Sequence, residues 1–251
     1  MVSIITPSCN SSKFIAQTIE SVLSQTYENW EMIIVDDMSK DNTVKIIEKY
    51  LQIDKRIRLI KSQKNVGPAL ARNKAIKEAV GKYIAFLDSD DVWLPNKLQV
   101  QVQFMINNNL PFSYSAYDVI DENSNYLKSF YVRDFIDYKG LLKKNIIGCL
   151  TAMYDAEKLG KIFMKNIGHE DYALWLDILK RVKYGKGINE PLARYRVVKK
   201  SISSNKLKTM AYQWNIYRKI EKIDFFKSIY FFLFYMYNGL KKYIFNLRIK
   251  K

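Results

Sequence analysis

Cysteine, histidine, glycine and proline are all scarce in this sequence. Only 2 Cys and 1 His occur among 251 residues, so the chain has neither a disulfide framework nor a spaced set of zinc-type ligands. The 9 Gly and 5 Pro stand against 48% hydrophobic residues, a composition that excludes collagen-like and disordered chains. The chain is therefore long and apolar enough to bury a sizeable core, and its few thiols favour a reducing cytoplasm.

Acidic residues and long hydrophobic runs are also few. Asp and Glu number 25 against 41 Lys and Arg, and the net charge of +16 favours an anionic partner: nucleic acid, anionic lipid or a phosphorylated substrate. The first residues lack the basic flank and the apolar core of about 7–15 residues that a signal peptide needs. No run reaches the roughly 20 apolar residues of a spanning helix, so we expect the catalytic part to stay in the cytoplasm.

Strand-like and helix-like patterns alternate over the first 90 residues. Segments with helical spacing at 13–25, 44–51 and 68–80 separate four short apolar runs. This alternation predicts a parallel sheet with right-handed crossovers. Farther along, the pattern predicts helices near 96–108 and 170–182 and strands near 112–117 and 148–154. The four apolar runs are residues 2–6, 32–35, 57–60 and 83–87.

The residues that follow three of these runs are unusually polar. Ligands of open parallel sheets bind beyond the carboxyl ends of the strands, so these residues are candidates for a binding site. Carboxylates two residues apart, as in Asp88 and Asp90, can hold one hard divalent cation, although acids are also common in turns and helix caps. The polar groups are Pro7, Ser8, Cys9 and Asn10 after the first run, Asp36 and Asp37 after the second, and Asp88, Ser89, Asp90 and Asp91 after the fourth.

The last 36 residues have a composition of their own. Residues 216–251 contain eleven aromatic residues, nine Lys or Arg and only two acids. Aromatic residues flanked by cations are typical of a membrane interface, although the same helix could pack on the rest of the protein or on another subunit. No nucleic-acid-binding motif accompanies this segment, so we expect an anionic membrane surface rather than nucleic acid as its partner.

Five ordered motifs lie in the first 91 residues, at 2–10 (VSIITPSCN), 19–27 (IESVLSQTY), 33–43 (IIVDDMSKDNT), 65–73 (NVGPALARN) and 83–91 (YIAFLDSDD). They resemble those of the family 2 glycosyltransferases that assemble bacterial polysaccharides. Five motifs in order are far more specific than any one of them. Coverage of the remainder is weaker and rests on residues 168–172 (GHEDY) and 192–196 (LARYR).

The resemblance implies an α/β protein of the GT-A fold, a Rossmann-like and mostly parallel sheet flanked by helices. The resemblance and the change of composition at residue 216 together predict a division of the chain. Residues 1–215 would form the glycosyltransferase domain, with a nucleotide-sugar-binding half at 1–91 and an acceptor half at 92–215. Residues 216–251 would form a basic, aromatic helical tail at the membrane interface.

The resemblance also implies which residues bind the donor and a divalent cation, Mn²⁺ or Mg²⁺. Asp37 matches a position that holds the nucleobase, and a carboxylate can accept the imide N–H of uracil, so a UDP-sugar is favoured. Cys9 stands where relatives commonly place an aromatic residue that stacks on the base. The full donor set is Pro7, Ser8, Cys9, Asp37, Arg72, Asp88 and Ser89, and the metal ligands are Asp88 and Asp90 of the Asp-x-Asp motif.

Glu170 and Asp171 resemble the acidic pair of the family, whose Asp is the general base toward the acceptor hydroxyl. We take Asp171 as the base and Glu170 as the alternative. Acids in a first helical turn can also merely complement the helix dipole. His169, the single histidine, is interpreted as a neighbour of the acceptor site.

Together these features predict an inverting, metal-dependent glycosyltransferase of cell-surface polysaccharide synthesis. It would move a single sugar to a saccharide acceptor, such as one linked to polyprenyl diphosphate, at the inner face of the membrane. The absence of spanning runs and of a Gln-x-x-Arg-Trp motif argues against processive polymerisation. Two alternatives remain: a sugar nucleotidyltransferase, which normally has a Gly-rich phosphate loop after the first strand, and a non-catalytic basic protein that binds membrane or nucleic acid.

Overall fold

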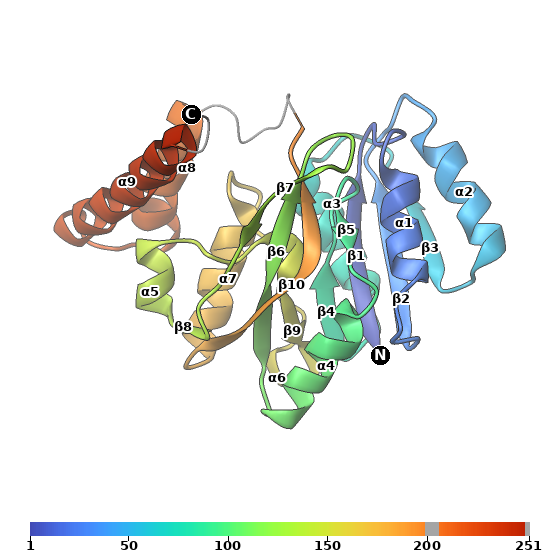
Figure 1. The fold of residues 1–251 in the computed structure, drawn as a ribbon, viewed down its shortest axis with the longest axis horizontal. Coiled ribbons are helices and arrows are strands. Elements are labelled where there is room, and N and C mark those ends of the chain that lie inside the picture. Colours follow the sequence, from blue (N-terminus) through green and yellow to red (C-terminus); the bar gives the residue numbers. More distant parts are fainter. Residues whose placement is uncertain (199–205, 249–251) are drawn as a thin grey trace.

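The computed structural model describes residues 1–198 and 206–248, which form a sheet flanked by helices on both faces (Figure 1). The strands are β1 (Val2–Ser8), β2 (Trp30–Asp36), β3 (Ile57–Lys61), β4 (Tyr83–Phe86), β5 (Val92–Trp93), β6 (Phe112–Ile120), β7 (Tyr126–Phe130), β8 (Phe135–Ile136), β9 (Met153–Asp155) and β10 (Gly185–Arg196). The helices are α1 (Ile15–Leu23), α2 (Thr43–Ile53), α3 (Pro68–Glu78), α4 (Lys97–Asn107), α5 (Tyr138–Lys143), α6 (Ala156–Leu159), α7 (Glu170–Arg181), α8 (Lys206–Asn215) and α9 (Phe225–Arg248), with a 3₁₀ turn η1 (Cys149–Thr151) and a π-helical turn η3 (Ile216–Ile220).

The ten strands belong to one sheet with the order β3-β2-β1-β4-β9-β6-β10-β5, to which β7 adds beside β6 and β8 beside β10. The first four strands in this order are parallel, which confirms the crossovers predicted from the sequence. β9 is antiparallel to both β4 and β6, and β10 is parallel to β6. The carboxyl ends of β1, β2, β3, β4, β6 and β10 therefore all lie at one edge of the sheet, here called the carboxyl edge.

Alternate residues of the central strands supply two separate cores. Ile5 of β1 packs on the face covered by α3, α5 and α7, whereas Ile4 packs on the face covered by α1, α2 and α4. Phe86 and Leu87, at the end of β4, divide in the same way. The two-residue period of a strand buried on both faces explains why these segments are continuous apolar runs in the sequence.

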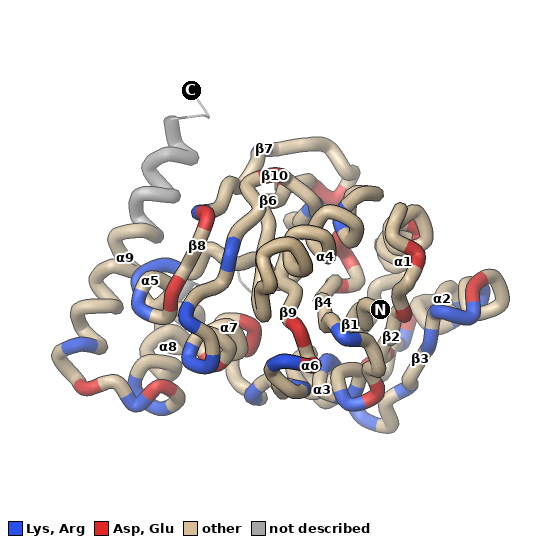
Figure 2. Tube along the Cα trace, turned by 90° about the horizontal axis from the view of Figure 1, so that it is seen from below, with Lys and Arg blue, Asp and Glu red and all other residues tan. Residues whose placement is uncertain are grey.

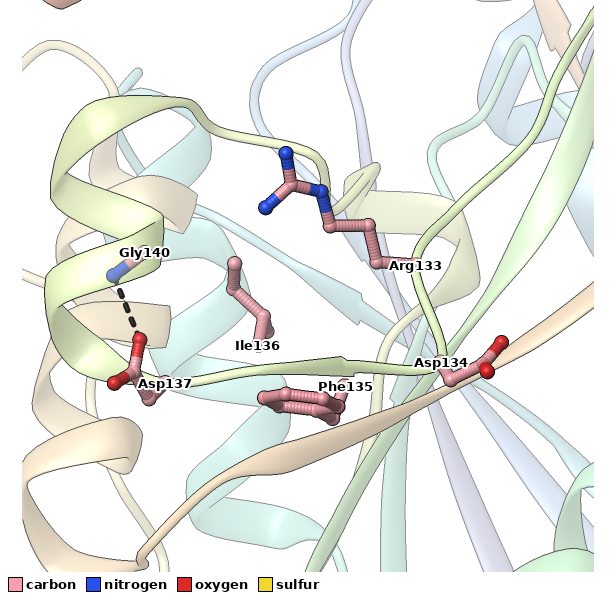
Figure 3. Close-up of a pocket in the computed structure, with 6 residues that line it drawn as sticks. All are labelled: Arg133, Asp134, Phe135, Ile136, Asp137 and Gly140. Atoms are coloured by element: carbon pink, nitrogen blue, oxygen red, sulfur yellow. Dashed lines mark hydrogen bonds between the residues drawn. The ribbon is translucent and has the colours of Figure 1, made fainter.

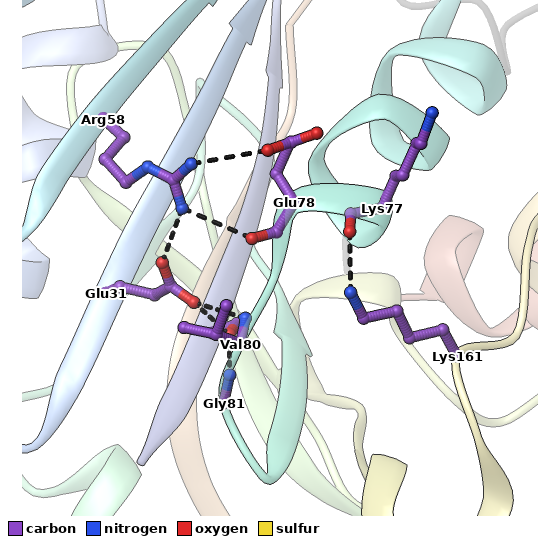
Figure 4. Close-up of polar contacts among 8 residues, drawn as sticks. Glu31, Arg58, Lys77, Glu78, Val80, Gly81 and Lys161 are labelled. Carbon is purple, nitrogen blue, oxygen red and sulfur yellow. Dashed lines mark hydrogen bonds and ion pairs between the residues drawn. The ribbon is translucent and has the colours of Figure 1, made fainter.

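A buried carboxylate joins α3 to the amino end of the sheet. Glu31 accepts hydrogen bonds from the backbone N–H of Val80 (2.8 Å) and from Arg58 (3.0 Å), as Figure 4 shows. Ser3 donates to the same carboxylate (2.6 Å) and accepts from the N–H of Gly81 (2.8 Å). This network holds the C-terminal end of α3, and so helps to fix the helix whose other end reaches the carboxyl edge.

The expectation of a strand over residues 148–154 is wrong for its first half. Residues Cys149–Thr151 form a 3₁₀ turn, and the strand begins only at Met153. Thr151 donates from both its N–H (2.9 Å) and its hydroxyl (2.8 Å) to the carbonyl of Gly148. These local bonds replace the ladder bonds that an extended strand would make.

The C-terminal helices pack at the end of the molecule opposite α2 (Figure 1). Ile216 and Tyr217 are at most 1% exposed and belong to the core that contains α3 and α7. Glu221 accepts a hydrogen bond from Tyr138 (2.6 Å) and pairs with Lys180 (3.0 Å). Packing is thus continuous across the boundary predicted at residue 216, and the first residues of the predicted tail are part of the folded core. Figure 2 shows the charges along this end of the chain.

Candidate active site

Asp37, directly after β2, is the centre of one cluster at the carboxyl edge. Its carboxylate accepts hydrogen bonds from the backbone N–H groups of Val66 (2.9 Å) and Gly67 (2.7 Å). Gly67 has a φ of +83°, which side chains rarely adopt, so glycine allows this turn to present both N–H groups to one carboxylate. β1 pairs with β2, so Asp37 lies next to Pro7 and Ser8 at the end of β1. The thiol of Cys9 donates to the carbonyl oxygen of Asp37 at 3.4 Å.

Residues 88–91 form a turn at the end of β4, and other elements hold all four of them. These contacts oppose the mutual repulsion of the carboxylates in this short acidic segment. The contacts are Arg72 to the carboxylate of Asp88 (2.6 Å), Ser11 to the hydroxyl of Ser89 (2.7 Å), the side chain of Arg196 to the carbonyl of Asp90 (2.8 Å) and the backbone N–H of Arg196 to the carboxylate of Asp91 (2.8 Å).

Arg72 of α3 connects this turn to the acidic pair. One nitrogen of its guanidinium donates to Asp88 (2.6 Å) and another to Glu170 (2.8 Å). The side chain of Arg72 is only 6% exposed, and its Nε has no hydrogen-bond partner among the described residues. The Nε atom is itself buried, so the guanidinium acts here through its two terminal nitrogens, which hold two carboxylates together.

Glu170 and Asp171 open α7, as the sequence predicts. His169 precedes them in a left-handed conformation with a φ of 60°, and its ring meets that of Tyr212 at a centroid distance of 5.8 Å. α8 therefore covers the turn that positions the acidic pair. Burial, and next the charge of Glu170, raise the pKa of Asp171 above its ordinary value. A carboxylate with a raised pKa is better suited to accept a proton.

Cys149 is a site residue that the sequence analysis does not identify. It lies in η1, where burial raises the pKa of its thiol well above the ordinary value and the charges of Asp88 and Asp171 add to that effect. The thiol therefore stays protonated, and it is close enough to Asp88 and to the acidic pair for their charges to act on it. No spacing rule marks such a residue, because residues far apart in the chain make up its surroundings.

Arg196 is the second such residue. It lies in the LARYR segment, but its role is visible only in the structure. Arg196 is only 2% exposed. Its Nε donates to the carbonyl of Asp90 (2.8 Å), and the central carbon of its guanidinium lies 4.7 Å from the ring centroid of Phe14. Besides Asp90, its guanidinium donates to Gln17 (2.8 Å), Ser124 (3.0 Å) and the carbonyl of Asp121 (3.1 Å).

Comparison with known proteins identifies this arrangement. The family described as "Glycosyl transferase family 2" matches residues 3–162. A Bacillus subtilis protein named "Putative teichuronic acid biosynthesis glycosyltransferase TuaG" is 45% identical over 96% of this chain and 97% of its own length. The chain is a family 2 glycosyltransferase. This family assignment excludes the alternatives of a sugar nucleotidyltransferase and of a non-catalytic binding protein.

Further relatives of this glycosyltransferase bear more specific names. An Escherichia coli protein, the "UDP-Glc:alpha-D-GlcNAc-diphosphoundecaprenol beta-1,3-glucosyltransferase WfgD", is 42% identical over 99% of the chain and 97% of its own length. Among solved structures, S. aureus TarS in complex with UDP-GlcNAc has a TM-score of 0.74 at 20% identity, and it covers 87% of this chain and 65% of its own. That likeness confirms the GT-A fold.

The carboxylates of Asp88 and Asp90 fit a divalent cation only in part. Within residues 1–198 and 206–248, no three His, Cys, Asp or Glu side chains stand close enough to enclose an ion on their own. Burial, and next the charge of Asp88, raise the pKa of Asp90 to about 6. A cation beside the two carboxylates would relieve this repulsion, and Mg²⁺ or Mn²⁺ commonly takes its remaining ligands from water and substrate phosphates. A mannosyltransferase of Pyrobaculum calidifontis with the same fold (TM-score 0.66, 17% identity, 89% of this chain and 64% of its own) was solved with GDP-Man and Mn²⁺.

A separate cavity of about 450 Å³ lies between β8 and α5 of the glycosyltransferase (Figure 3). β8 pairs with Gly185 and Lys186, which are the first residues of β10. The cavity is therefore at the opposite edge of the sheet from Arg196 and the acidic turn, and it does not belong to the candidate active site. Among the described helices, none is long and apolar enough to cross a membrane.

Proposed function

We propose that this enzyme transfers one sugar, with inversion, from a UDP-sugar to a saccharide linked through diphosphate to a polyprenol. The observation that carries the proposal is the bridge through Arg72, which brings the first turn of α7 beside the Asp-x-Asp turn at 2.6 and 2.8 Å. Such a bridge supports the proposal, because it holds Asp88, which we assign to the donor and cation, close to the acidic pair, which we assign to the general base. An inverting transfer needs this arrangement, because the base must face the departing nucleotide across the sugar.

The names of two relatives suggest the first substrates to test. WfgD and WfaP of Escherichia coli, 42% and 41% identical over 99% and 100% of the chain, are both named as transferring glucose from UDP-Glc to GlcNAc on diphosphoundecaprenol. TuaG is named for teichuronic acid biosynthesis. We take a UDP-hexose as donor and a lipid-linked amino sugar as acceptor, in the synthesis of a cell-surface polysaccharide.

The residues of this chain have distinct roles in the proposed reaction. The Asp37 carboxylate, oriented by two backbone N–H groups, accepts the imide N–H of uracil. Arg72 belongs to the diphosphate end of the donor site, where its guanidinium holds the Asp88 carboxylate in place at 2.6 Å. Asp171 accepts the proton of the acceptor hydroxyl while that oxygen bonds to the anomeric carbon. The bond from this carbon to the diphosphate oxygen breaks, and UDP leaves with the electron pair.

Asp88 and Asp90 would hold Mn²⁺ or Mg²⁺ together with the donor. A bound cation supplies neutralisation of the negative charge that grows on the departing diphosphate. Pro7, Ser8, Cys9 and Ser89 line the nucleoside side of the same edge. In this role Ser89 is held by Ser11, and the thiol of Cys9 replaces a stacking ring.

The acceptor also locates the reaction. A polyprenol keeps its saccharide at a membrane surface, so we propose that the enzyme works as a peripheral protein at the inner face of the cytoplasmic membrane.

A transfer assay tests the proposal. The purified protein is mixed with a GlcNAc-diphosphate-lipid and with UDP-Glc, UDP-Gal or UDP-GlcNAc, with and without Mn²⁺. The masses of the products are measured by mass spectrometry. We expect one hexose to be added, and only when Mn²⁺ or Mg²⁺ is present. Addition of several sugars would contradict single transfer, and full activity in EDTA would contradict the metal assignment.

A further inference from the structure

The outer face of α9 is the largest run of exposed apolar side chains on one described helix. Its members are between 36% and 80% exposed. Their spacing of three or four residues along two adjacent rows puts them on one side of the helix. This exposed face of α9 consists of Phe225, Phe226, Ile229, Tyr230, Leu233, Phe234, Met236 and Tyr237.

The opposite side of α9 is also apolar and packs against the rest of the protein. Phe231 and Phe232 pack against the main core, and the ring of Phe232 meets that of Trp214 at 5.5 Å. Ser228 is fully buried between them and α8, with its hydroxyl bonded to the carbonyl of Asp224 (2.8 Å). A helix that is apolar on all sides is normally buried on all sides, so the exposed face of α9 requires a further partner.

Two cations border this face, and one of them is paired with an acid. The Nζ of Lys143 on α5 lies 5.9 Å from the ring centroid of Tyr230 and 5.4 Å from that of Phe234. Lys227 lies within the exposed rows, and its pairing with Asp224 (3.1 Å) occupies the acid nearest to it in the chain. Two copies of the chain would bring these cations together, whereas an anionic surface would attract them.

We propose that the exposed face of α9 binds the headgroup region of an anionic lipid bilayer. The inference rests on the proposed function, because the acceptor of that reaction is a lipid. The exposed face covers only about 18 Å of the helix, no described helix is apolar enough to cross a bilayer, and the other side of α9 packs on the core, so we place the helix along the membrane surface. Rings then enter the interface while Lys143 and Lys227 contact lipid phosphates.

Vesicle binding tests this orientation. The full chain is sedimented with vesicles of phosphatidylcholine alone or of equal parts phosphatidylcholine and phosphatidylglycerol. The variant Phe226→Ser/Leu233→Ser/Tyr237→Ser removes three of the most exposed rings and side chains of the face. The matched control Tyr126→Ser/Tyr131→Ser/Phe135→Ser removes three aromatic residues of equal exposure, between 63% and 64%, outside α9.

We expect the α9 variant to lose at least about tenfold in affinity for the anionic vesicles and the control to bind like the parent protein. Parent binding should weaken in salt and persist in part, because salt does not screen the apolar contacts. Equal binding by parent and α9 variant would overturn the proposal, as would a dimer in light scattering that the α9 variant alone abolishes. Vesicle binding without any sugar transfer would instead refute the proposed function and leave the lipid surface standing.

A second, independent observation concerns Arg196. Its backbone and side chain hold both Asp91 and Asp90, while its remaining donors anchor it to α1 through Gln17 and to the turn after β6 through Ser124. No carboxylate oxygen of a described residue lies within ion-pair distance of its guanidinium, so its partners there are neutral oxygens. We infer that Arg196 is a positioning residue: it fixes the backbone of Asp90 and the carboxylate of Asp91, and so the turn that would present the Asp90 carboxylate to the cation and the donor diphosphate.

Calorimetry of UDP binding, with and without Mn²⁺, separates this role from a general contribution to stability. We expect Arg196→Met to weaken Mn²⁺-dependent binding by at least about tenfold and metal-free binding by far less, with partial rescue in Arg196→Lys. The exposed neighbour Arg194→Met is the control for charge. If Arg196→Met does not fold, Gln17→Ala/Ser124→Ala frees the guanidinium and should weaken Mn²⁺-dependent binding in the same direction.

Equal loss of UDP binding with and without Mn²⁺ would overturn the positioning role. Unchanged binding in both the Arg196 and the Gln17/Ser124 variants would overturn it as well. If the parent protein itself binds no UDP, the proposed function fails instead.

Discussion

Arg72 donates to Glu170 across 2.8 Å, although the two residues are 98 positions apart in the chain. The same guanidinium holds Asp88 at 2.6 Å, so one buried cation joins the turn after β4 to the start of α7. Removal of one partner of a buried ion pair leaves the other charge unpaired, which costs more than the pair contributes. The bridge through Arg72 therefore couples the stability of the turn after β4 to that of the start of α7.

Arg72→Met should reduce the free energy of unfolding by about 3–5 kcal/mol, because two carboxylates lose their counter-charge. Urea unfolding measures this loss. The double variant Arg72→Met/Glu170→Gln should be more stable than the sum of the two single effects predicts. Strictly additive losses would show that Glu170 does not depend on Arg72.

Asp171→Asn should bind UDP nearly as well as the parent protein and lose transfer by at least about 10², the scale expected when a general base is removed. Glu170→Gln should retain more activity. It should also move the acidic limb of the pH profile of kcat to lower pH, because the charge of Glu170 is, after burial, the main reason that the pKa of Asp171 is raised. Near-parental turnover in Asp171→Asn together with loss in Glu170→Gln would reverse the two roles.

Asp90→Asn should stabilise the protein at neutral pH in the absence of divalent cations. Burial, and next Asp88, raise the pKa of Asp90 to about 6 in the folded state. The folded state therefore holds more protons than the unfolded state between about pH 4 and 6, and its stability falls as the pH rises through this window.

The stability gain of Asp90→Asn should be on the order of 1–3 kcal/mol at pH 7.5 and should vanish near pH 4. Thermal unfolding across this pH range measures it, with the exposed Asp134→Asn as control. Added Mn²⁺ should raise the melting temperature of the parent protein and not that of Asp90→Asn. Parallel pH curves for the parent and Asp90→Asn would refute the assignment of the shifted group.

The parallel half of the fold could be predicted because its signals are local. β1 and β2 are buried on both faces, so each is a continuous apolar run, and their polar neighbours Asp37 and Cys9 follow at once in the sequence. The helix that carries Glu170 and Asp171 is predicted within one residue, because its sequence pattern is local as well. Strand ends that point the same way then bring these residues to one edge without further information.

The rest of the site depends on contacts that leave no local pattern. β10 contains Asn189, Glu190 and Pro191 and shifts its register around Pro191, so its twelve residues do not look like one strand. Arg196 ends this strand, and its partners lie up to 179 positions away. The composition break at residue 216 likewise does not mark a break in packing, because Tyr217 donates to the carbonyl of Leu142 (2.7 Å) inside the core.

The configuration of the new glycosidic bond tests the central claim most directly. UDP-Glc carries its sugar in the α configuration, so a single displacement at the anomeric carbon with Asp171 as the base must give a β-linked product. NMR of the product formed with GlcNAc-diphosphate-lipid and Mn²⁺ reports this configuration through the coupling of the anomeric proton. The account predicts one β-linked hexose per acceptor, and an α-linked product would contradict it.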